Sequence, residues 1–348
     1  MKKAYAGMDI GSKECAAVVL DSRGKLVDAA TFRTSERNLV CWGKNHAGTT
    51  VLIEECEIAG WVRSVLKPRV RQVVVSDPRQ NAWIAKGTDK SDKVDAAKLA
   101  HLNRMGSYKE VFHTDDADIA AFKMLVKHYD KTTRRLAAVK SQIKGLLRGQ
   151  GIITTGAAVY HSGRNRALSK VDGNMIRLAI EQDYALLDYL EAAQQVSRRN
   201  VVKASALFPI IARLKEIPGV GDITAARFVA YVADPHRFNK GALNRYSCLA
   251  VVDRTSGNSH LGRRCLNKDG NSALKDVSNT IFHAAISCTK PNGIKAFYAK
   301  SLRRTTDRDK ARLNTQRKIL ALMLAIWRNE ERYSDDRVTG RKRALPSA

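Results

Sequence analysis

The sequence lacks any run of about 18 apolar residues, the length that a membrane-spanning helix needs. Its first residues, Met1-Lys2-Lys3, lead into a predicted strand rather than the apolar core of a signal peptide, so we expect a cytoplasmic protein. It also lacks a C-x-x-C pair or a short Cys/His cluster, which argues against a zinc site and a disulfide framework. The six cysteines are interpreted as reduced, partly buried thiols: Cys15, Cys41, Cys56, Cys248, Cys265 and Cys288.

Acidic residues are few compared with basic ones. The 348 residues include 61 Lys and Arg against 34 Asp and Glu, which gives a formal net charge of +27. A positive field of this size favours a polyanionic partner, and nucleic acid is the leading candidate, although a membrane surface could also attract the chain. With 44% hydrophobic residues the chain can bury at least one sizeable core, and two or three structural units are expected.

The first structural unit is organised around Asp9. Residues 4–21 predict a buried strand that carries Asp9, a turn around Gly11, and a second strand that ends at Asp21. A lone buried carboxylate is costly without a partner or a metal ion. The alternative is an acid that only caps the turn at the strand end.

The following residues predict more strands and helices of a mixed sheet. Strands are expected at 26–32, 50–55 and 72–75, and helices at 35–46, capped by Ser35, at 61–66 and at 78–86. The strand at 50–55 ends in Glu54 and Glu55. Glu54 directly follows the apolar run, and alternation would turn Glu55 to the other face, so Glu54 is the preferred site residue.

A pair of acids opens the helix predicted after residue 91. Asp92 and Asp95 are three residues apart, which places both carboxylates on one helix face. They could equally serve the helix itself, with Asp92 as N-cap and Asp95 at the third position. If Asp9, Glu54, Asp92 and Asp95 converge, their repulsion requires neutralising cations. Magnesium suits such a site, and two ions could stabilise an in-line phosphoryl displacement.

A heptad-like seam then predicts a long helical arm. Residues at steps of three and four form this seam, which is typical of a coiled coil: Phe122, Leu125, Tyr129, Thr132, Leu136, Val139, Ile143 and Leu146. A second amphipathic stretch runs through Tyr184 toward Arg199, so an antiparallel hairpin or a dimerisation arm is expected. The flanks of the first stretch are strongly basic, with Asp130 as the sole acid between residues 126 and 148. They form either a solvated face or a phosphate-binding surface. Its candidate nucleic-acid contacts are Lys127, Lys131, Arg134, Arg135, Lys140 and Lys144.

The last large region combines a glycine turn with a polar loop. Residues 217–221, with Gly219 and Gly221, are similar to a helix-hairpin-helix turn whose amides bind phosphate, although a plain helix–helix turn is the alternative. Helices are expected up to 233 and at 240–250, followed by a loop at 251–271. Ser256 in this loop could attack a phosphodiester, or simply form a turn. Further candidate phosphate contacts are Arg263, Arg264 and Lys268. A basic helical stretch at 300–327 and a loose polar tail at 334–348 complete the chain.

Together these motifs resemble those of the DEDD transposases of bacterial insertion sequences, recombinases guided by a bridge RNA. The resemblance is carried by residues 8–12, the Glu54 strand, 75–79, 90–96, 217–221, 255–257 and 268–271, in the family's order. It implies an RNase H-fold, RuvC-like domain at 1–120, a coiled-coil arm at 121–205, a mainly helical transposase domain at 206–332, and a flexible tail at 333–348.

The same resemblance implies the chemistry. Asp9, Glu54, Asp92 and Asp95 would bind Mg²⁺, and Ser256 would form a phosphoserine link with DNA, with Thr255 and Ser259 as other candidate nucleophiles. The partners would be the element ends, target DNA, a bridge RNA and further copies of the chain, as a dimer or tetramer acting at the bacterial nucleoid, with the two domains acting together across protomers. Two alternatives stay open: a RuvC-like endonuclease that uses activated water, and a non-catalytic basic nucleic-acid-binding protein.

Overall fold

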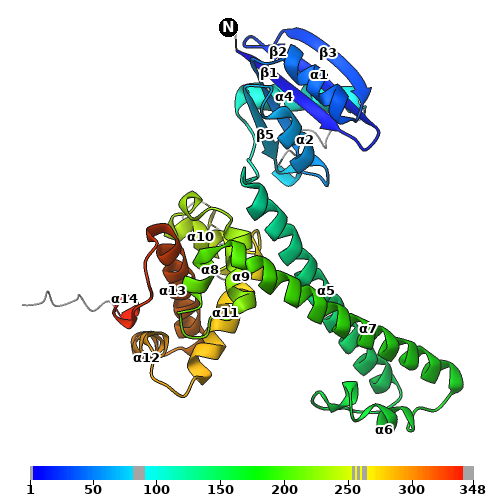
Figure 1. The fold of residues 1–348 in the computed structure, drawn as a ribbon, viewed down its shortest axis with the longest axis vertical. Coiled ribbons are helices and arrows are strands. Elements are labelled where there is room, and N and C mark those ends of the chain that lie inside the picture. Colours follow the sequence, from blue (N-terminus) through cyan, green and yellow to red (C-terminus); the bar gives the residue numbers. More distant parts are fainter. Residues whose placement is uncertain (1–2, 81–90, 253–254, 257–258, 261–264, 340–348) are drawn as a thin grey trace, which may run out of the picture. The chain divides into compact units, whose positions relative to one another are not determined.

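The computed structural model describes residues 3–80, 91–252, 255–256, 259–260 and 265–339 (Figure 1). The chain forms two compact units, residues 1–113 and 114–348. None of the described helices is both long and apolar enough to cross a membrane.

The first unit is built on a five-stranded mixed sheet with the order β3-β2-β1-β4-β5. Strands β1, β2 and β3 pair antiparallel, whereas β1–β4 and β4–β5 are parallel. Because β1 is central and its neighbour β4 runs parallel to it, both strands deliver their last residues to the same edge of the sheet. The strands are β1 (Ala4–Ile10), β2 (Glu14–Asp21), β3 (Leu26–Arg33), β4 (Thr49–Glu54) and β5 (Gln72–Ser76). The predicted strands are confirmed.

Helices cover both faces of this sheet. On one face α1 (Glu36–Asn45) and α2 (Ala59–Leu66) pack their apolar sides on a core that includes Met8, Val51 and Ile53. Ser35 caps α1 as predicted, with its side chain accepting a hydrogen bond from the Asn38 amide. After β5 a short 3₁₀ helix, η1 (Pro78–Gln80), begins the segment predicted as helix 78–86, and residues 81–90 lie outside the described part of the chain.

The other face is covered by α4 (Asp92–Met105). It lies so close to β1 that a β-carbon built on Gly7 would come within 2.2 Å of the backbone of α4, so this position requires glycine. The side chain of Asn103 ties the helix to the sheet, since its amide nitrogen donates to the carbonyl oxygens of Ala6 and Thr50, both at 2.8 Å. The first turn of α4 is thereby fixed relative to the strand ends.

The second unit contains two long helices, α5 (Ala117–Gly149) and α7 (Asn174–Ala204), which lie side by side and antiparallel (Figure 1). The short helices η2 (Ala158–Tyr160) and α6 (Arg164–Leu168) pack at the end of this pair. The seam of α5 differs from the expected one. Val126 and Leu147 are buried where Leu125 and Leu146 were expected. The buried face of α5 is the one that packs against α7 and α9, and a heptad pattern in α5 alone does not specify it.

The rest of the second unit is a helical bundle. Its helices are η3 (Ser205–Leu207), α8 (Pro209–Leu214), α9 (Asp222–Val232), η4 (Pro235–Arg237), α10 (Lys240–Tyr246), α11 (Ser272–Ser287), α12 (Gly293–Thr305), α13 (Arg308–Asn329) and α14 (Asp335–Thr339). The basic stretch expected as one helix at 300–327 is therefore two, because Thr306 adopts a left-handed conformation and Asp307 caps the next helix. Helix α10 also ends at Tyr246, earlier than the expected residue 250.

The segment expected to be a plain loop at 251–271 contains short antiparallel strands. Strand β6 (Val251–Val252) pairs with β9 (Cys265–Leu266), and β7 (Thr255–Ser256) pairs with β8 (Ser259–His260). The expectation of a structureless loop was wrong, because pairs of neighbouring residues in this segment form backbone ladders only two residues long. We name residues 251–266 the serine hairpin.

Candidate active site

Asp9 and Glu54 end adjacent parallel strands on the same face of the sheet. The register pairs Met8 with Ile53, so Asp9 and Glu54 occupy the next position of β1 and β4. Two residues earlier, Gly7 and Leu52 face α4. Since side chains alternate along a strand, Asp9 and Glu54 share the face that α4 covers.

Asp92 and Asp95 come to this edge from the first turn of α4. Ser91, not Asp92, is the N-cap of this helix, and its hydroxyl accepts a hydrogen bond from the Val94 amide at 3.3 Å. The expected alternative of Asp92 as N-cap is therefore wrong, because the serine immediately before it already fills that role. Neither Asp92 nor Asp95 is the N-cap of α4. Lys98 forms an ion pair with Asp95 at 3.2 Å.

The electrostatics of Asp9 show that the four predicted acids are near one another. Burial is the largest cause that raises the pKa of the Asp9 carboxyl, and the negative charges of Asp92, Asp95 and Glu54 follow as further causes. A carboxylate surrounded in this way binds a cation or a proton favourably. The oxygen donors suit a hard divalent ion. Within the described residues, however, no three His, Cys, Asp or Glu side chains are close enough together to hold one ion.

The structure separates Glu54 from Glu55. The side chain of Glu55 is paired with the His113 ring at 2.6 Å, and it is Glu54 whose charge acts on Asp9. The geometry thus sets Glu54 beside the other acids and leaves Glu55 engaged elsewhere in the first unit.

A further acid, Asp77, was not predicted as a site residue. It follows β5 directly and is buried, and the Arg79 guanidinium donates to both of its oxygens at 3.0 and 2.8 Å. The hydrogen bonds from Arg79 lower the pKa of the Asp77 carboxyl. The signal for it in the sequence was the same as for Glu54, an acid at the end of an apolar strand. Because its charge is already neutralised by Arg79, we interpret it as a structural acid of this edge.

The loop that follows Asp9 is held from the neighbouring strand. The Thr34 hydroxyl donates to the Gly11 carbonyl oxygen at 2.7 Å and lies 3.3 Å from the Cys15 sulfur. Burial is the main cause that raises the pKa of the Cys15 thiol, so this thiol stays protonated at neutral pH. The turn around Gly11 therefore fixes the backbone that presents Asp9.

In the second unit the candidate hydroxyl residues lie on one hairpin. Ser256 and Ser259 are paired residues of β7 and β8, and Thr255 is paired with His260. Arg263 and Arg264 lie outside the described residues, and Lys268 is exposed just beyond β9. The backbone thus brings both candidate serines to the same end of the serine hairpin.

The predicted phosphate-binding turn has a packing role. Gly219 has a φ of 86°, and a β-carbon there would lie 2.6 Å from the carbonyl oxygen of Ile281 in α11. The Gly221 amide donates to the Thr224 hydroxyl at 2.9 Å within the turn. Glycine at 219 is therefore required by the contact between this turn and α11, and phosphate binding at Gly219 and Gly221 stays a prediction.

The basic residues of α5 divide into two groups. Lys127, Lys131, Arg134 and Arg135 are exposed. Lys140 instead forms an ion pair with Glu191 at 2.8 Å, and Lys144 donates to the Gly156 carbonyl oxygen at 2.8 Å. Both of these lysines also lie over the Tyr160 ring. The first group is available to a phosphate backbone, whereas the second stabilises the end of the α5–α7 pair.

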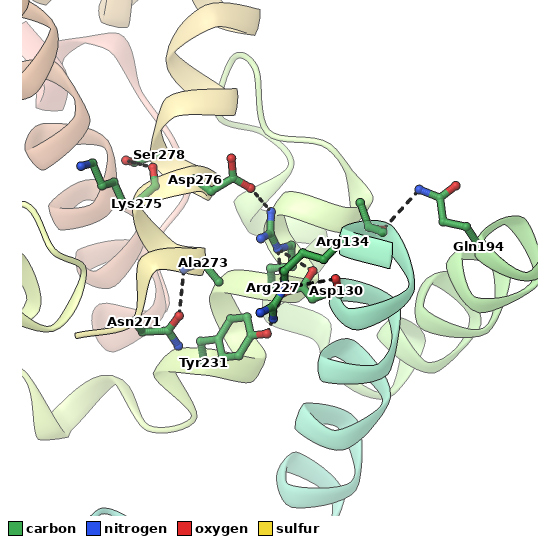
Figure 2. Close-up of polar contacts among 11 residues, drawn as sticks. Asp130, Arg134, Gln194, Arg227, Tyr231, Asn271, Ala273, Lys275, Asp276 and Ser278 are labelled. Atoms are coloured by element: carbon green, nitrogen blue, oxygen red, sulfur yellow. Dashed lines mark hydrogen bonds and ion pairs between the residues drawn. The ribbon is translucent and has the colours of Figure 1, made fainter. Parts of the chain in front are cut away.

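A buried polar network joins α5 to the helical bundle (Figure 2). Asp130, expected on the charged flank of α5, is instead 4% exposed and pairs with Arg227 of α9 at 3.1 Å. The Tyr231 hydroxyl donates to it at 2.6 Å, and Arg227 also pairs with Asp276 of α11 at 2.6 Å. The expectation was wrong because the bundle packs against this side of α5. The network links the long helix to the helix that follows the serine hairpin.

Comparison with known proteins identifies the class of this site. A transposase family model of the DEDD type of IS110 elements matches residues 6–151, and the model of the transposase IS116/IS110/IS902 family matches residues 211–299. The transposase for insertion sequence element IS1111A from Coxiella burnetii is 24% identical over 289 residues, covering 78% of this chain and 74% of that protein.

The mixed sheet, the acids at its edge and these matches define a transposase, an enzyme that cuts and rejoins DNA. The chain belongs to the IS110 family of DEDD transposases of insertion sequences. DEDD domains of this kind use divalent metal ions.

Proposed function

We propose that this transposase excises and inserts its own insertion sequence by attack of a serine hydroxyl on DNA at a site that requires Mg²⁺. Two ions would be held by Asp9, Glu54, Asp92 and Asp95, and Ser256 would be the nucleophile. The observation that carries the proposal is that Asp9 and Glu54 end adjacent parallel strands on the face covered by α4, whose first turn carries Asp92 and Asp95. Burial, followed by the charges of these three acids, raises the pKa of Asp9. Acids that repel one another in this way are typical of a functional site, where a bound cation relieves the repulsion between their charges.

The chain's own residues supply positioning and charge. The α4 packing on Gly7 and the Thr34 hydrogen bond to the loop after β1 hold the acids at one edge of the sheet. Bound Mg²⁺ would polarise the phosphate oxygens of the DNA. The exposed cations Lys127, Lys131, Arg134 and Arg135 would contact the phosphate backbone. Three further basic residues would do the same: Arg263, Arg264 and Lys268.

Substitutions in the serine hairpin test the nucleophile, and omission of Mg²⁺ tests the metal requirement separately. The full chain would be incubated with DNA of its element ends and its copurifying RNA, with and without Mg²⁺, and resolved under denaturing conditions. We expect Ser256→Ala to abolish the covalent protein–DNA adduct, whereas matched Thr255→Ala and Ser259→Ala variants retain it.

Three outcomes would change the proposal. Undiminished cleavage by Ser256→Ala would indicate a nuclease in which water attacks. Loss of the adduct in Ser259→Ala alone would move the nucleophile to the paired strand. Binding without any metal-dependent cleavage would indicate a non-catalytic nucleic-acid-binding protein.

We propose further that a bridge RNA selects the donor and target DNA. The net charge of +27 supports a protein that binds more than one polyanion. Sequencing of the RNA that copurifies with the chain tests this. A discrete transcript from beside its own gene is expected, and only random fragments of cellular RNA would contradict the proposal.

We propose that copies of the chain pair as dimers or tetramers through a coiled coil that includes the outer side of α7. Five large apolar side chains are exposed there, and their spacing places them on one face, away from the face that contacts α5. They extend over about 32 Å of helix. They are Met175, Leu178, Leu186, Tyr189 and Val196, which we name the outer stripe. An exposed apolar stripe of this length favours a second helix as partner.

A further inference from the structure

A polar groove lies between α11 and α13 in the second unit, next to the serine hairpin. It has a volume of about 680 Å³ and is lined along one side by Lys275 and Asn279 of α11, and along the other by Lys310, Arg312 and Gln316 of α13. Leu266 of β9, at the base of the serine hairpin, also lines it. A ligand in this groove would therefore lie beside the base of the serine hairpin.

Two side-chain amides form a recognition pair in the groove. Gln316, only 5% exposed, donates from Nε2 to Asn279 Oδ1 at 2.9 Å. This bond uses one donor of Gln316 and an acceptor of Asn279, and leaves Gln316 Oε1 and Asn279 Nδ2 without a partner among the described residues. An acceptor beside a donor is complementary to the edge of a nucleobase, as in amide recognition of adenine.

The charges around this amide pair favour an anion. No hydrogen bond or ion pair engages the Lys275 ammonium among the described residues. Asp276, which also lines the groove, is paired with Arg227 at 2.6 Å, and Asp309 is paired with Arg312 at 3.0 Å. Each of these two acids thus already has a basic partner, and Lys275 is left to contact a phosphate.

We propose that this groove is a nucleotide-binding subsite for a single-stranded segment of the polynucleotide on which the transposase acts. Lys275 contacts a backbone phosphate, and the Asn279–Gln316 pair contacts the edge of an unpaired base. This inference rests on the proposed function, and it adds a place where the enzyme reads a base near the hairpin. The groove chemistry is shared by DNA and RNA, so the experiment compares both.

The test measures binding alone, so that it stays separate from cleavage. The full-length Asp9→Asn protein, in chelator, would be titrated with short oligo(dA), oligo(dT) and oligo(rA), and its lysines would be acetylated with and without each probe. We expect oligonucleotide to protect Lys275 from acetylation more than Lys290, an exposed lysine outside the groove. Stronger protection by oligo(rA) than by oligo(dA) assigns the groove to RNA, and the reverse assigns it to DNA.

Variants separate phosphate contact from base contact. Lys275→Gln should weaken binding of all probes about equally, and by more than Lys290→Gln does. Asn279→Leu and Gln316→Leu should instead remove roughly a fivefold preference between oligo(dA) and oligo(dT). Equal acetylation of Lys275 with and without probe, or a base preference unchanged in both amide variants, would overturn the proposal. Because no strand cleavage is required, failure here would leave the metal and serine proposals to their own test.

Discussion

Asp9→Asn is expected to make the metal-free protein more stable while it abolishes catalysis. The substitution removes a charge that burial disfavours and that Asp92, Asp95 and Glu54 also repel. Partly exposed like charges at a protein surface cost a few tenths of a kcal/mol per pair, so three of them amount to about 1 kcal/mol. The wild type would maintain this repulsion because the acids are needed for function, a familiar exchange of stability for activity.

The sign of the pH dependence follows from the direction of the shift. The folded protein binds the Asp9 proton more tightly than the unfolded chain, whose carboxyl has the ordinary pKa of 3.8. Below that value both states are protonated and the cost is absent. As the pH rises through the higher pKa of the folded state, the wild type loses stability that Asp9→Asn keeps. The gap between the two proteins should therefore grow from acidic to neutral pH.

Urea unfolding measures this gap. In chelator at neutral pH, Asp9→Asn should unfold at higher urea than the wild type, and added Mg²⁺ should stabilise the wild type more than the variant. Asp21→Asn is a matched control of opposite sign, because Asp21 accepts hydrogen bonds from the Arg23 and Lys25 amides, which lower its pKa. An Asp9→Asn protein that is less stable than the wild type in chelator, at every pH, would refute the convergence of the four acids.

Three further experiments probe the fold and the assembly. Gly7→Ala should cost at least about 3 kcal/mol in thermal unfolding, because its methyl group would overlap the backbone of α4, and a cost below 1 kcal/mol would contradict that packing. Asp130→Ala should cost about 3 kcal/mol by leaving Arg227 with one partner in a buried setting, and Asp130→Asn less, since it keeps an acceptor for the tyrosine. Equal costs would show that the acceptor contributes nothing and that loss of the charge accounts for the whole effect. Leu186→Glu combined with Tyr189→Glu should shift the chain toward monomer in sedimentation, and an unchanged mass would exclude the outer stripe as the interface.

Local patterns were sufficient for the strands and for several helix starts. Apolar alternation located β1, β4 and β5, and Ser35 marked the start of α1, because these features depend on neighbours in sequence. The preference for Glu54 over Glu55 came from alternation too. In the structure the two side chains have different neighbours. Glu55 is paired with His113, fifty-eight residues away in the sequence, whereas the charge of Glu54 acts on Asp9.

What local patterns could not locate depends on contacts between distant segments. Asp130 looked like one acid on a basic helix face, and only the packing of α9 against α5 shows that it is buried and paired. Pairing in the serine hairpin was missed because its strands are two residues long, too short for alternation to register. The amide pair of Asn279 and Gln316 joins two helices and has no signature in either.

By itself the sequence determined the order of the elements, the excess of positive charge and the acids that end the strands, because these are properties of residues and of their immediate neighbours. Only the tertiary structure decided which of these acids act on Asp9. Parallel pairing sets Glu54 beside it, and the close packing of α4 on Gly7 brings in a helix that begins more than eighty residues later. Repulsion between charges depends on distance in space, which separation along the chain does not specify.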